Sequence, residues 1–255
     1  MSTPSAVEPP YRFYDSRLLP ARAPAGRSRW LIRIVLWLAV AVLLVFALRF
    51  DVALMRWRYD VLPDGPRGFA KEAVVSFRDF GQQIPIVVGC IIIAVLDRRR
   101  RTIVPAILVA QLLAMGVYDL TKFTVVRDRP QCAIESAMSD PQNGADRPID
   151  AQQVLAAMQL GDTWRGLSAY NRDSRHQSFP SGHSSASFAF AGVLAWFYPP
   201  LALLWWILAV GCAASRYVDA VHWLSDCIAG ASIGYAAAWL ALRPWAWSRA
   251  WAREK

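Results

Sequence analysis

The chain has 255 residues, of which 55% are hydrophobic, and its mean hydropathy is +0.26. This composition is too apolar for an ordinary soluble domain of that length and indicates a membrane protein. The net charge of +9 does not point to a nucleic-acid partner, because the basic residues flank hydrophobic runs and are not interleaved with aromatic residues.

Apolar runs recur along the chain, separated by polar breaks. A helix needs roughly 20 apolar residues to cross the hydrocarbon, and shorter runs can extend into small residues where helices pack together. The pattern predicts an all-α integral membrane bundle of six transmembrane helices. The expected spans are residues 30–48, 84–96, 103–120, 188–198, 201–214 and 224–242.

Clusters of basic residues lie before the first run, between the second and third, and after the last. The positive-inside rule makes this side cytoplasmic, although the first outward loop also carries basic residues. We therefore expect a multi-pass protein of the cell (inner) membrane with both termini in the cytoplasm. Its parts would be a disordered tail over 1–29, a membrane domain over 30–242 and a second tail over 243–255.

Two polar segments separate these runs on the outer side. Residues 49–83 are expected to form a loop, followed by a helical stretch at 69–80 along the membrane surface. Residues 131–178 contain one amphipathic stretch, 150–160. We expect this stretch, with Trp164 and Leu167, to cover the site and select the lipid, since loops this long usually have a function. The four cysteines show no CxxC spacing and are expected to be free thiols.

The first polar cluster follows the third span. Lys122 and Arg129 are seven positions apart, about two helical turns, so both can face one point before Pro130 stops the helix. Arg127 could either assist phosphate binding or reach lipid headgroups from the interface. Asp119 precedes Lys122 by three positions, and we expect it to hold the lysine through a charge-assisted hydrogen bond.

The second and third clusters open the fourth span and connect the fifth to the sixth. Ser181 and Gly182 at a helix start leave backbone N–H groups facing one point, where the helix dipole favours an anion. His222 and Asp226 form an i, i+4 pair, so one helical face can bring the carboxylate to the imidazole. With six spans, all three clusters reach the outer face.

These clusters resemble the three motifs of the type-2 phosphatidic acid phosphatase superfamily, in the same order. The matching segments are Lys-x6-Arg-Pro, Pro-Ser-Gly-His and Ser-Arg-x5-His-x3-Asp. The resemblance implies that His222 forms a phosphohistidine, that Asp226 supports it and that His183 is the general acid. It implies a phosphate-binding set and no metal or other cofactor. That set is Lys122, Arg129, Ser181, Gly182 and Arg216.

The expected activity is hydrolysis of a phosphomonoester or pyrophosphate on a membrane lipid, at an extracytoplasmic site. Phosphatidic acid, phosphatidylglycerol phosphate, undecaprenyl pyrophosphate and a lipid A phosphate all remain open as substrates, because the motifs recognise phosphate and not the lipid tail. A lipid phosphotransferase with the same phosphoenzyme is a second interpretation. A non-catalytic lipid-binding or transport protein is a third. His176 matches no motif position and is interpreted as an ordinary loop residue.

Overall fold

The computed structural model describes residues 26–97, 103–138, 151–166 and 176–243. Residues 1–39 and 40–255 form separate compact units, and the account below concerns the second. The α-helices are α1 (Gly26–Val61), α2 (Phe69–Asp79), α3 (Gln83–Leu96), α4 (Ile103–Thr124), α5 (Pro130–Met138), α6 (Ala151–Ala157), α7 (Gly182–Phe197), α8 (Ala202–Val218) and α9 (Leu224–Ala241). Two 3-10 turns, η4 (Leu160–Thr163) and η6 (Pro199–Leu201), and two short strands, β1 (Val126–Arg127) and β2 (Trp164–Gly166), complete the described elements.

The predicted all-α class is confirmed for the described residues, whereas the count of six spans is not. Four segments are long and apolar enough to cross a membrane: Ile34–Val61, Ile103–Thr124, Pro199–Val218 and Leu224–Ala241. Helices α2 and α3 meet the same criterion only together and are bent by 62°, which would make a fifth, broken span. Helix α7, predicted as the fourth span, has 16 residues, so it is only about 24 Å long against a hydrocarbon core of about 30 Å.

Helix α1 extends beyond its predicted end. Residues 49–61, expected to be part of a polar loop, continue the helix to Val61, because no proline or glycine interrupts it before Pro63. This extension buries two charged side chains, Asp51 and Arg58. Arg58 donates from Nε and an Nη to the carbonyl oxygen of Val218, at 2.8 and 2.6 Å. The hydropathy pattern placed the end of the span at residue 48, because the charges that follow lower the mean hydropathy. Asp51 and Arg58 are nevertheless compatible with a continued helix, since they are buried inside the protein.

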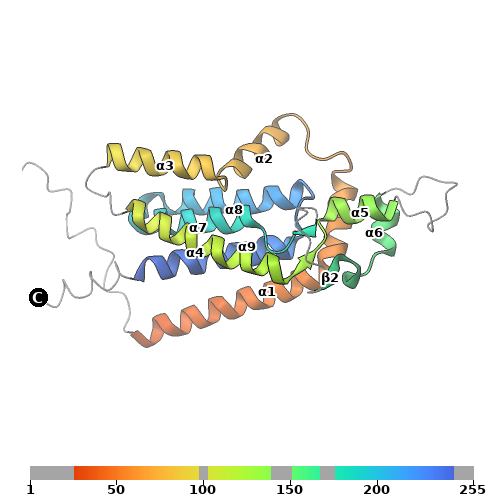
Figure 1. Ribbon diagram of the computed structural model, residues 1–255, viewed down its shortest axis with the longest axis horizontal. Helices are drawn as coiled ribbons and strands as arrows, with labels where there is room; N and C mark the ends of the chain where they lie inside the picture. Colours follow the sequence, from red (N-terminus) through yellow and green to blue (C-terminus); the bar gives the residue numbers. More distant parts are fainter. Residues whose placement is uncertain (1–25, 98–102, 139–150, 167–175, 244–255) are drawn as a thin grey trace, which may run out of the picture. The chain divides into compact units, whose positions relative to one another are not determined.

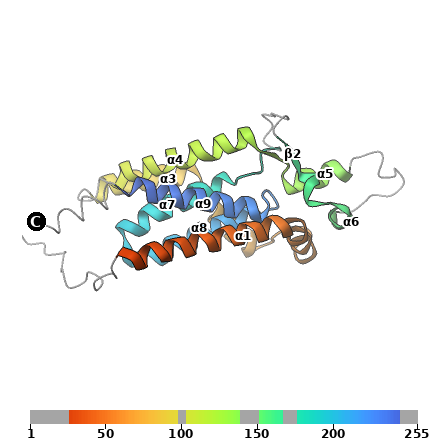
Figure 2. The ribbon, with the colours of Figure 1, turned by 90° about the horizontal axis from the view of Figure 1, so that it is seen from below.

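Helices α4, α7, α8 and α9 lie side by side and form the centre of the second unit (Figures 1 and 2). Small residues let α7 and α9 approach closely. A Cβ atom on Gly230 would lie 2.3 Å from the carbonyl oxygen of Ser181, and one on Gly234 only 2.1 Å from that of Ser185. These glycines bring the start of α7, with His183, against the start of α9, with Asp226.

We expect Gly234→Val to separate α7 from α9, because the valine Cβ would overlap a backbone oxygen that cannot move without shifting the helix. Thermal unfolding in detergent should begin at least several degrees lower than in the wild type. Gly116→Val on α4 is the matched control, since nothing lies within 4 Å of a Cβ built there. Equal stabilities of the two variants would contradict the close α7–α9 packing.

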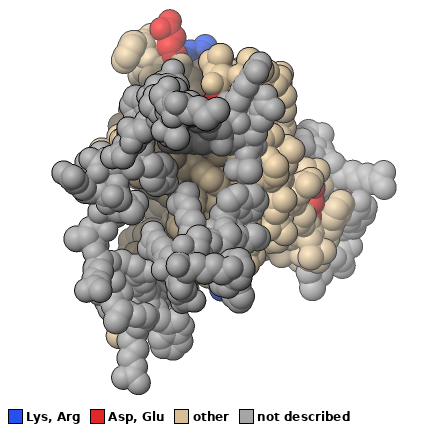
Figure 3. Space-filling view, turned by 90° about the vertical axis from the view of Figure 1, so that its left-hand side faces the viewer, with Lys and Arg blue, Asp and Glu red and all other residues tan. Residues whose placement is uncertain are grey.

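Large apolar side chains cover the outer faces of these helices. Ile91 and Val95 on α3, Leu112 on α4 and Leu203 on α8 are all more than half exposed. In the end-on view of Figure 3 the visible described residues are mostly uncharged, with Lys or Arg and Asp or Glu side chains mainly near the edges. A solvent-facing surface of a soluble protein would seldom be so apolar over several neighbouring helices, so this surface suits the hydrocarbon of a bilayer.

Candidate active site

Six of the predicted site residues line one cavity of about 520 Å³: Lys122, Arg129, Gly182, His183, Arg216 and His222. They come from the end of α4, the segment just before α5, the start of α7, the end of α8 and the turn before α9. Helices α4 and α8 run antiparallel to α7 and α9, so the ends of α4 and α8 meet the starts of α7 and α9 (Figure 1). The three motifs therefore converge at one point, as the sequence predicted.

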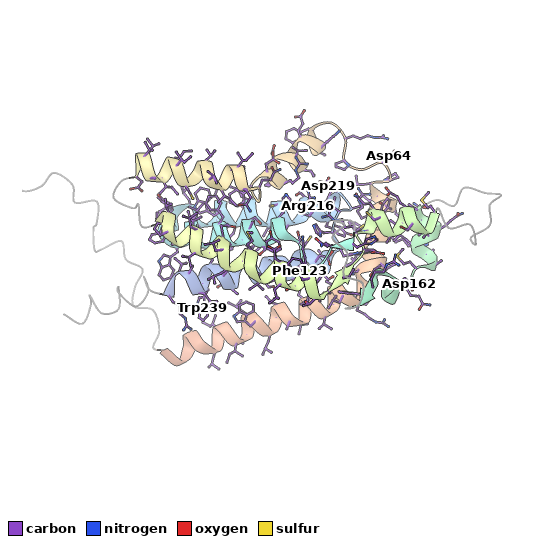
Figure 4. The ribbon with its side chains drawn as sticks, viewed as in Figure 1. Asp64, Phe123, Asp162, Arg216, Asp219 and Trp239 are labelled. Carbon is purple, nitrogen blue, oxygen red and sulfur yellow. The ribbon has the colours of Figure 1, made fainter. Side chains whose placement is uncertain are left out.

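Three cationic side chains reach this cavity. Arg216 is 8% exposed, and its buried Nε has no hydrogen-bond partner among the described residues, which leaves a donor available to a ligand. One Nη of Arg216, in the last turn of α8, lies 3.6 Å from a carboxylate oxygen of Asp219, the residue that caps the C-terminal end of this helix (Figure 4). Lys122 and Arg129 add two further positive charges to the wall. Such a concentration of cations favours a phosphate group.

The start of α7 supplies backbone donors. Ser181 is the N-cap: its Oγ accepts from the backbone N–H of Ser184 at 3.4 Å and from the Ser184 hydroxyl at 3.0 Å. Ser181 is fully buried and does not line the cavity, whereas Gly182 and His183 do. The serine thus stabilises the helix end, and the helix N-terminus with its partial positive charge faces the cavity.

His222 and Asp226 lie together as predicted. Nδ1 of His222 is 3.6 Å from Oδ2 of Asp226, and the Ser178 hydroxyl donates to the same oxygen at 2.6 Å. Burial lowers the pKa of His222, although the Asp226 carboxylate opposes this effect. The ring is therefore neutral at pH 7 and retains a lone pair. Because Nδ1 faces the carboxylate, Nε2 is the nitrogen available for attack.

His183 is the second imidazole in the cavity wall. Burial, together with the positive charges of Arg216 and other nearby groups, lowers the pKa of His183 to about 4. A bound phosphate carries about −1.5 to −2 charges and would offset these cations, so the pKa of His183 would rise when a substrate binds. Protonation of this ring is thereby coupled to the presence of the anion.

Arg127 fits neither interpretation left open by the sequence. Its side chain is fully buried, does not line the cavity and does not reach an interface. One Nη donates to Oδ1 of Asp226 at 2.6 Å, and the other donates to Oδ2 of Asp51 at 2.7 Å. The guanidinium also lies 4.4 Å from the ring centre of Trp164. Arg127 therefore holds the side of Asp226 that faces away from His222.

Asp119 does not hold Lys122 by a direct bond. Within the described part of the chain the two side chains form no hydrogen bond or close ion pair, and the Lys122 ammonium instead lies 5.3 Å from the ring centre of Tyr118. The i, i+3 spacing made these side chains neighbours, but the lysine turns towards the aromatic face one turn back along the helix. The Asp119 charge still acts on the ammonium through space.

Asp119→Asn is accordingly expected to lower kcat/KM only slightly, by up to about fivefold, because a part-exposed charge interaction is worth ~1 kcal/mol or less. The loss should disappear when Lys122 is already replaced by Met, since both changes would then act on the same absent ammonium. Steady-state kinetics of the four proteins in this double-mutant cycle measure the coupling. Fully additive losses would show that Asp119 acts on something other than Lys122.

One wall of the cavity was not predicted. The bend between α2 and α3 contributes Gly81 and Gln82, and α4 contributes Gln111 and Tyr118. A Cβ on Gly81 would lie 2.6 Å from both the Cys212 sulfur and the His183 carbonyl oxygen, so the bend packs directly on α7 and α8. In the sequence, Gly81 and the two glutamines after it lie between apolar runs and indicate a break in the helix. No sequence feature indicated that this break lies beside the three motifs.

The segment predicted to cover the site lies elsewhere. Asp150 and Leu167 are outside the described residues, and α6 packs its buried Val154 and Leu155 into a second apolar cluster with Met55 and Trp223. None of the described residues from 151 to 166 lines the cavity. The apolar pattern of the segment reflects this packing. Trp164 contacts Arg127 behind the site instead of covering its opening.

His176 is placed outside the cavity as well. Its Nδ1 lies 2.5 Å from a carboxylate oxygen of the buried Asp128, and Arg165 donates to the other oxygen at 2.8 Å. Trp223 also donates from its indole N–H to the Asp128 backbone oxygen at 2.8 Å. These contacts anchor the segment after β1 to the turn before α9, and they give His176 a structural position near the site.

Comparisons with known proteins agree with this geometry. The family model described as the PAP2 superfamily matches residues 103–250. The crystal structure of Aquifex aeolicus LpxE is similar in fold, with a TM-score of 0.52 and 18% identity over 75% of this chain and 93% of that chain. A search of curated proteins gave no match. Because the matched region contains all three motifs and more than half of the chain, this protein belongs to the PAP2 superfamily.

Proposed function

We propose that this protein is an integral membrane phosphatase that hydrolyses a phosphomonoester or a terminal pyrophosphate on a lipid through a phosphohistidine at His222. The observation that carries the proposal is the single cavity in which two histidines face three cations and the start of α7. The membership of the PAP2 superfamily and the apolar helix surfaces support it.

In the first step, Nε2 of His222 attacks phosphorus and the bond from phosphorus to the lipid oxygen breaks. Lys122, Arg129 and Arg216 hold the other phosphate oxygens and stabilise the charge that they carry in the transition state. His183 gives its proton to the lipid oxygen as this leaves. The ring of His222 becomes positively charged, and Asp226 stabilises it from the Nδ1 side.

In the second step, water attacks the phosphohistidine. His183, now neutral, accepts a proton from the water while the phosphorus–nitrogen bond breaks. Inorganic phosphate leaves and His222 regains its lone pair. A lipid or sugar alcohol in place of this water would make the protein a phosphotransferase with the same first step.

The proposed site faces the extracytoplasmic side, with both termini in the cytoplasm. Support comes from the basic clusters on the opposite side of the predicted spans. A lipid phosphate at the membrane surface can then enter the cavity from the bilayer while its acyl chains stay in the hydrocarbon.

The purified protein in detergent should release inorganic phosphate from at least one of four lipids: phosphatidic acid, phosphatidylglycerol phosphate, undecaprenyl pyrophosphate or a phosphorylated lipid A. Phosphate that leaves the lipid but appears on another lipid or a sugar would support transfer. Binding of these lipids without loss of phosphate from any of them would contradict an enzymatic role.

Phosphate release should persist in excess EDTA. Among the described residues no group of three or more His, Cys, Asp or Glu side chains is placed to hold a metal ion, and no carboxylate lines the cavity. The positive charge that a metal would supply comes from the lysine and the two arginines. The test compares initial rates of phosphate release with and without EDTA, on whichever of the four lipids proves to be a substrate. Loss of activity that Mg²⁺ restores would refute metal independence.

A further inference from the structure

Asp51 is a fully buried carboxylate on α1, outside the region that matches the family. Its Oδ2 accepts from an Nη of Arg127 at 2.7 Å and from the hydroxyl of Ser225, and its Oδ1 accepts from the backbone N–H of Ser225 at 3.0 Å. An ionisable side chain inside a candidate membrane span is costly unless it is paired, and such residues commonly serve a function.

The partners of Asp51 lead directly to the proposed nucleophile. Arg127 is fully buried and joins two carboxylates, with one Nη 2.7 Å from Asp51 and the other 2.6 Å from Oδ1 of Asp226. Oδ2 of Asp226 then faces Nδ1 of His222 at 3.6 Å. The indole of Trp223 lies 5.1 Å from the guanidinium and helps to hold it in place. Four charged or polar groups therefore form one continuous chain from α1 to the cavity.

The charges in this chain explain why a second carboxylate is useful. Arg127 alone would neutralise Asp226 and weaken its attraction for a positively charged imidazole. With Asp51 present, two carboxylates share one guanidinium, which leaves a net charge of about −1 behind His222. The cavity in front of His222 already holds three cations, so the positive ring formed on phosphorylation needs this negative charge.

We infer that Asp51 is a positioning residue of the phosphoryl-transfer site: by sharing Arg127 with Asp226, it keeps the Asp226 carboxylate oriented and negatively charged towards His222. The inference rests on the proposed function, because it assumes that His222 becomes positively charged during turnover. It places a catalytic requirement on α1, which the three motifs do not include.

Asp51→Asn tests the inference, since it removes the charge and keeps nearly the same size. We expect kcat to fall by ~10- to 100-fold, the range known for side chains that hold metal ligands in place, with KM changed less than about twofold. Asp60→Asn is the matched control: the same substitution on the exposed side of the same helix, expected to leave kcat unchanged. Equal kcat in both variants would overturn the inference.

Binding of inorganic ions gives a readout that does not depend on the lipid. Orthovanadate can bond to a nucleophile in five-coordinate geometry and resembles the transition state, whereas inorganic phosphate resembles the ground state. Asp51→Asn should weaken vanadate binding at least about tenfold and phosphate binding by less than about twofold. Equal weakening of both would indicate general damage to the site and would also overturn the inference.

Loss of a buried partner of Arg127 could prevent folding of Asp51→Asn, because an unpaired buried charge is strongly destabilising. Ser225→Ala then carries the test. It keeps every charge but removes the hydroxyl that accepts from Arg127 at 2.7 Å and donates to Asp51. We expect it to weaken vanadate binding by ~2- to 5-fold and phosphate binding hardly at all. If vanadate binding were unchanged in Ser225→Ala, the inferred link from Asp51 through Arg127 to Asp226 would be contradicted.

The two proposals fail in different ways. A wild-type protein that binds vanadate but releases phosphate from none of the lipids would refute the proposed function, while the Asp51 comparison could still be made. A wild-type phosphatase whose Asp51→Asn variant retains full kcat and full vanadate affinity would refute only the inference.

Discussion

His222→Ala is expected to reduce phosphate release from the lipid substrate to background, because no other described cavity-lining side chain is positioned as a supported nucleophile. His183 has no carboxylate partner among the described residues, and its pKa is lowered to about 4, whereas His222 is aligned by Asp226. The expected loss is at least ~10⁴-fold, as for nucleophiles in other covalent mechanisms.

The measurement should follow both turnover and trapping of the intermediate. Wild-type protein denatured during turnover of a lipid labelled with radioactive phosphate should retain an acid-labile label, and His222→Ala should retain none. Normal expression and extraction by detergent are expected, because removal of the ring deletes little packing at the cavity wall. Turnover close to that of the wild type would exclude His222 as the nucleophile.

Asp226→Asn is expected to have the second largest effect, a loss in kcat of about 10³-fold, somewhat smaller than the loss of about 10⁴-fold for the aspartate of a serine protease triad. The carboxylate accepts from Arg127, Ser178 and the backbone N–H of Trp223, at 2.6, 2.6 and 2.9 Å. An asparagine amide would direct N–H groups towards one of these donors and towards His222. The imidazole would then lose both its orientation and the negative charge that stabilises it.

Ser178→Ala is the matched control for this prediction. It removes one hydrogen bond to Asp226 at 2.6 Å but leaves the carboxylate and its charge in place. We expect a loss in kcat of only about tenfold or less. If the serine and aspartate variants were equally impaired, orientation of the ring would matter more than the charge of Asp226.

The residues of the catalytic motifs were predictable because their chemistry is local in the sequence. Lys122 and Arg129 are seven positions apart and His222 and Asp226 are four apart, so each pair is close in the sequence. The expected helical face was wrong for both pairs: α4 ends at Thr124, β1 and non-helical residues separate Lys122 from Arg129, Pro130 begins α5, and His222 lies in the turn before α9. The structure brings Lys122, Arg129, His222 and the start of α7 to one cavity, with Asp226 behind His222. Hydropathy likewise indicated α4, α8 and α9, since each contains a long apolar run.

Other features depended on contacts between distant segments. The sequence placed Asp51 in a polar loop and indicated that Arg127 binds phosphate or lies at the membrane interface. Neither segment contains a nearby residue that would reveal the pairing of these two charges. Only the folded chain places them 2.7 Å apart, 76 positions from each other in the sequence, where each compensates for the burial of the other. For Asp119 the error was the reverse, because a contact expected from sequence spacing did not form. Lys122, three positions further along, turns towards the ring of Tyr118 instead.

The sequence by itself determined the membrane character, the helical class and the chemical groups of the candidate site, because apolar run length, helical period and residue chemistry are properties of short segments. The tertiary structure decided which charges are buried, which helices approach through glycines and which side chains face the cavity. These features arise from pairing between segments far apart in the chain, and a buried charge acquires its role from the partner that packing brings to it.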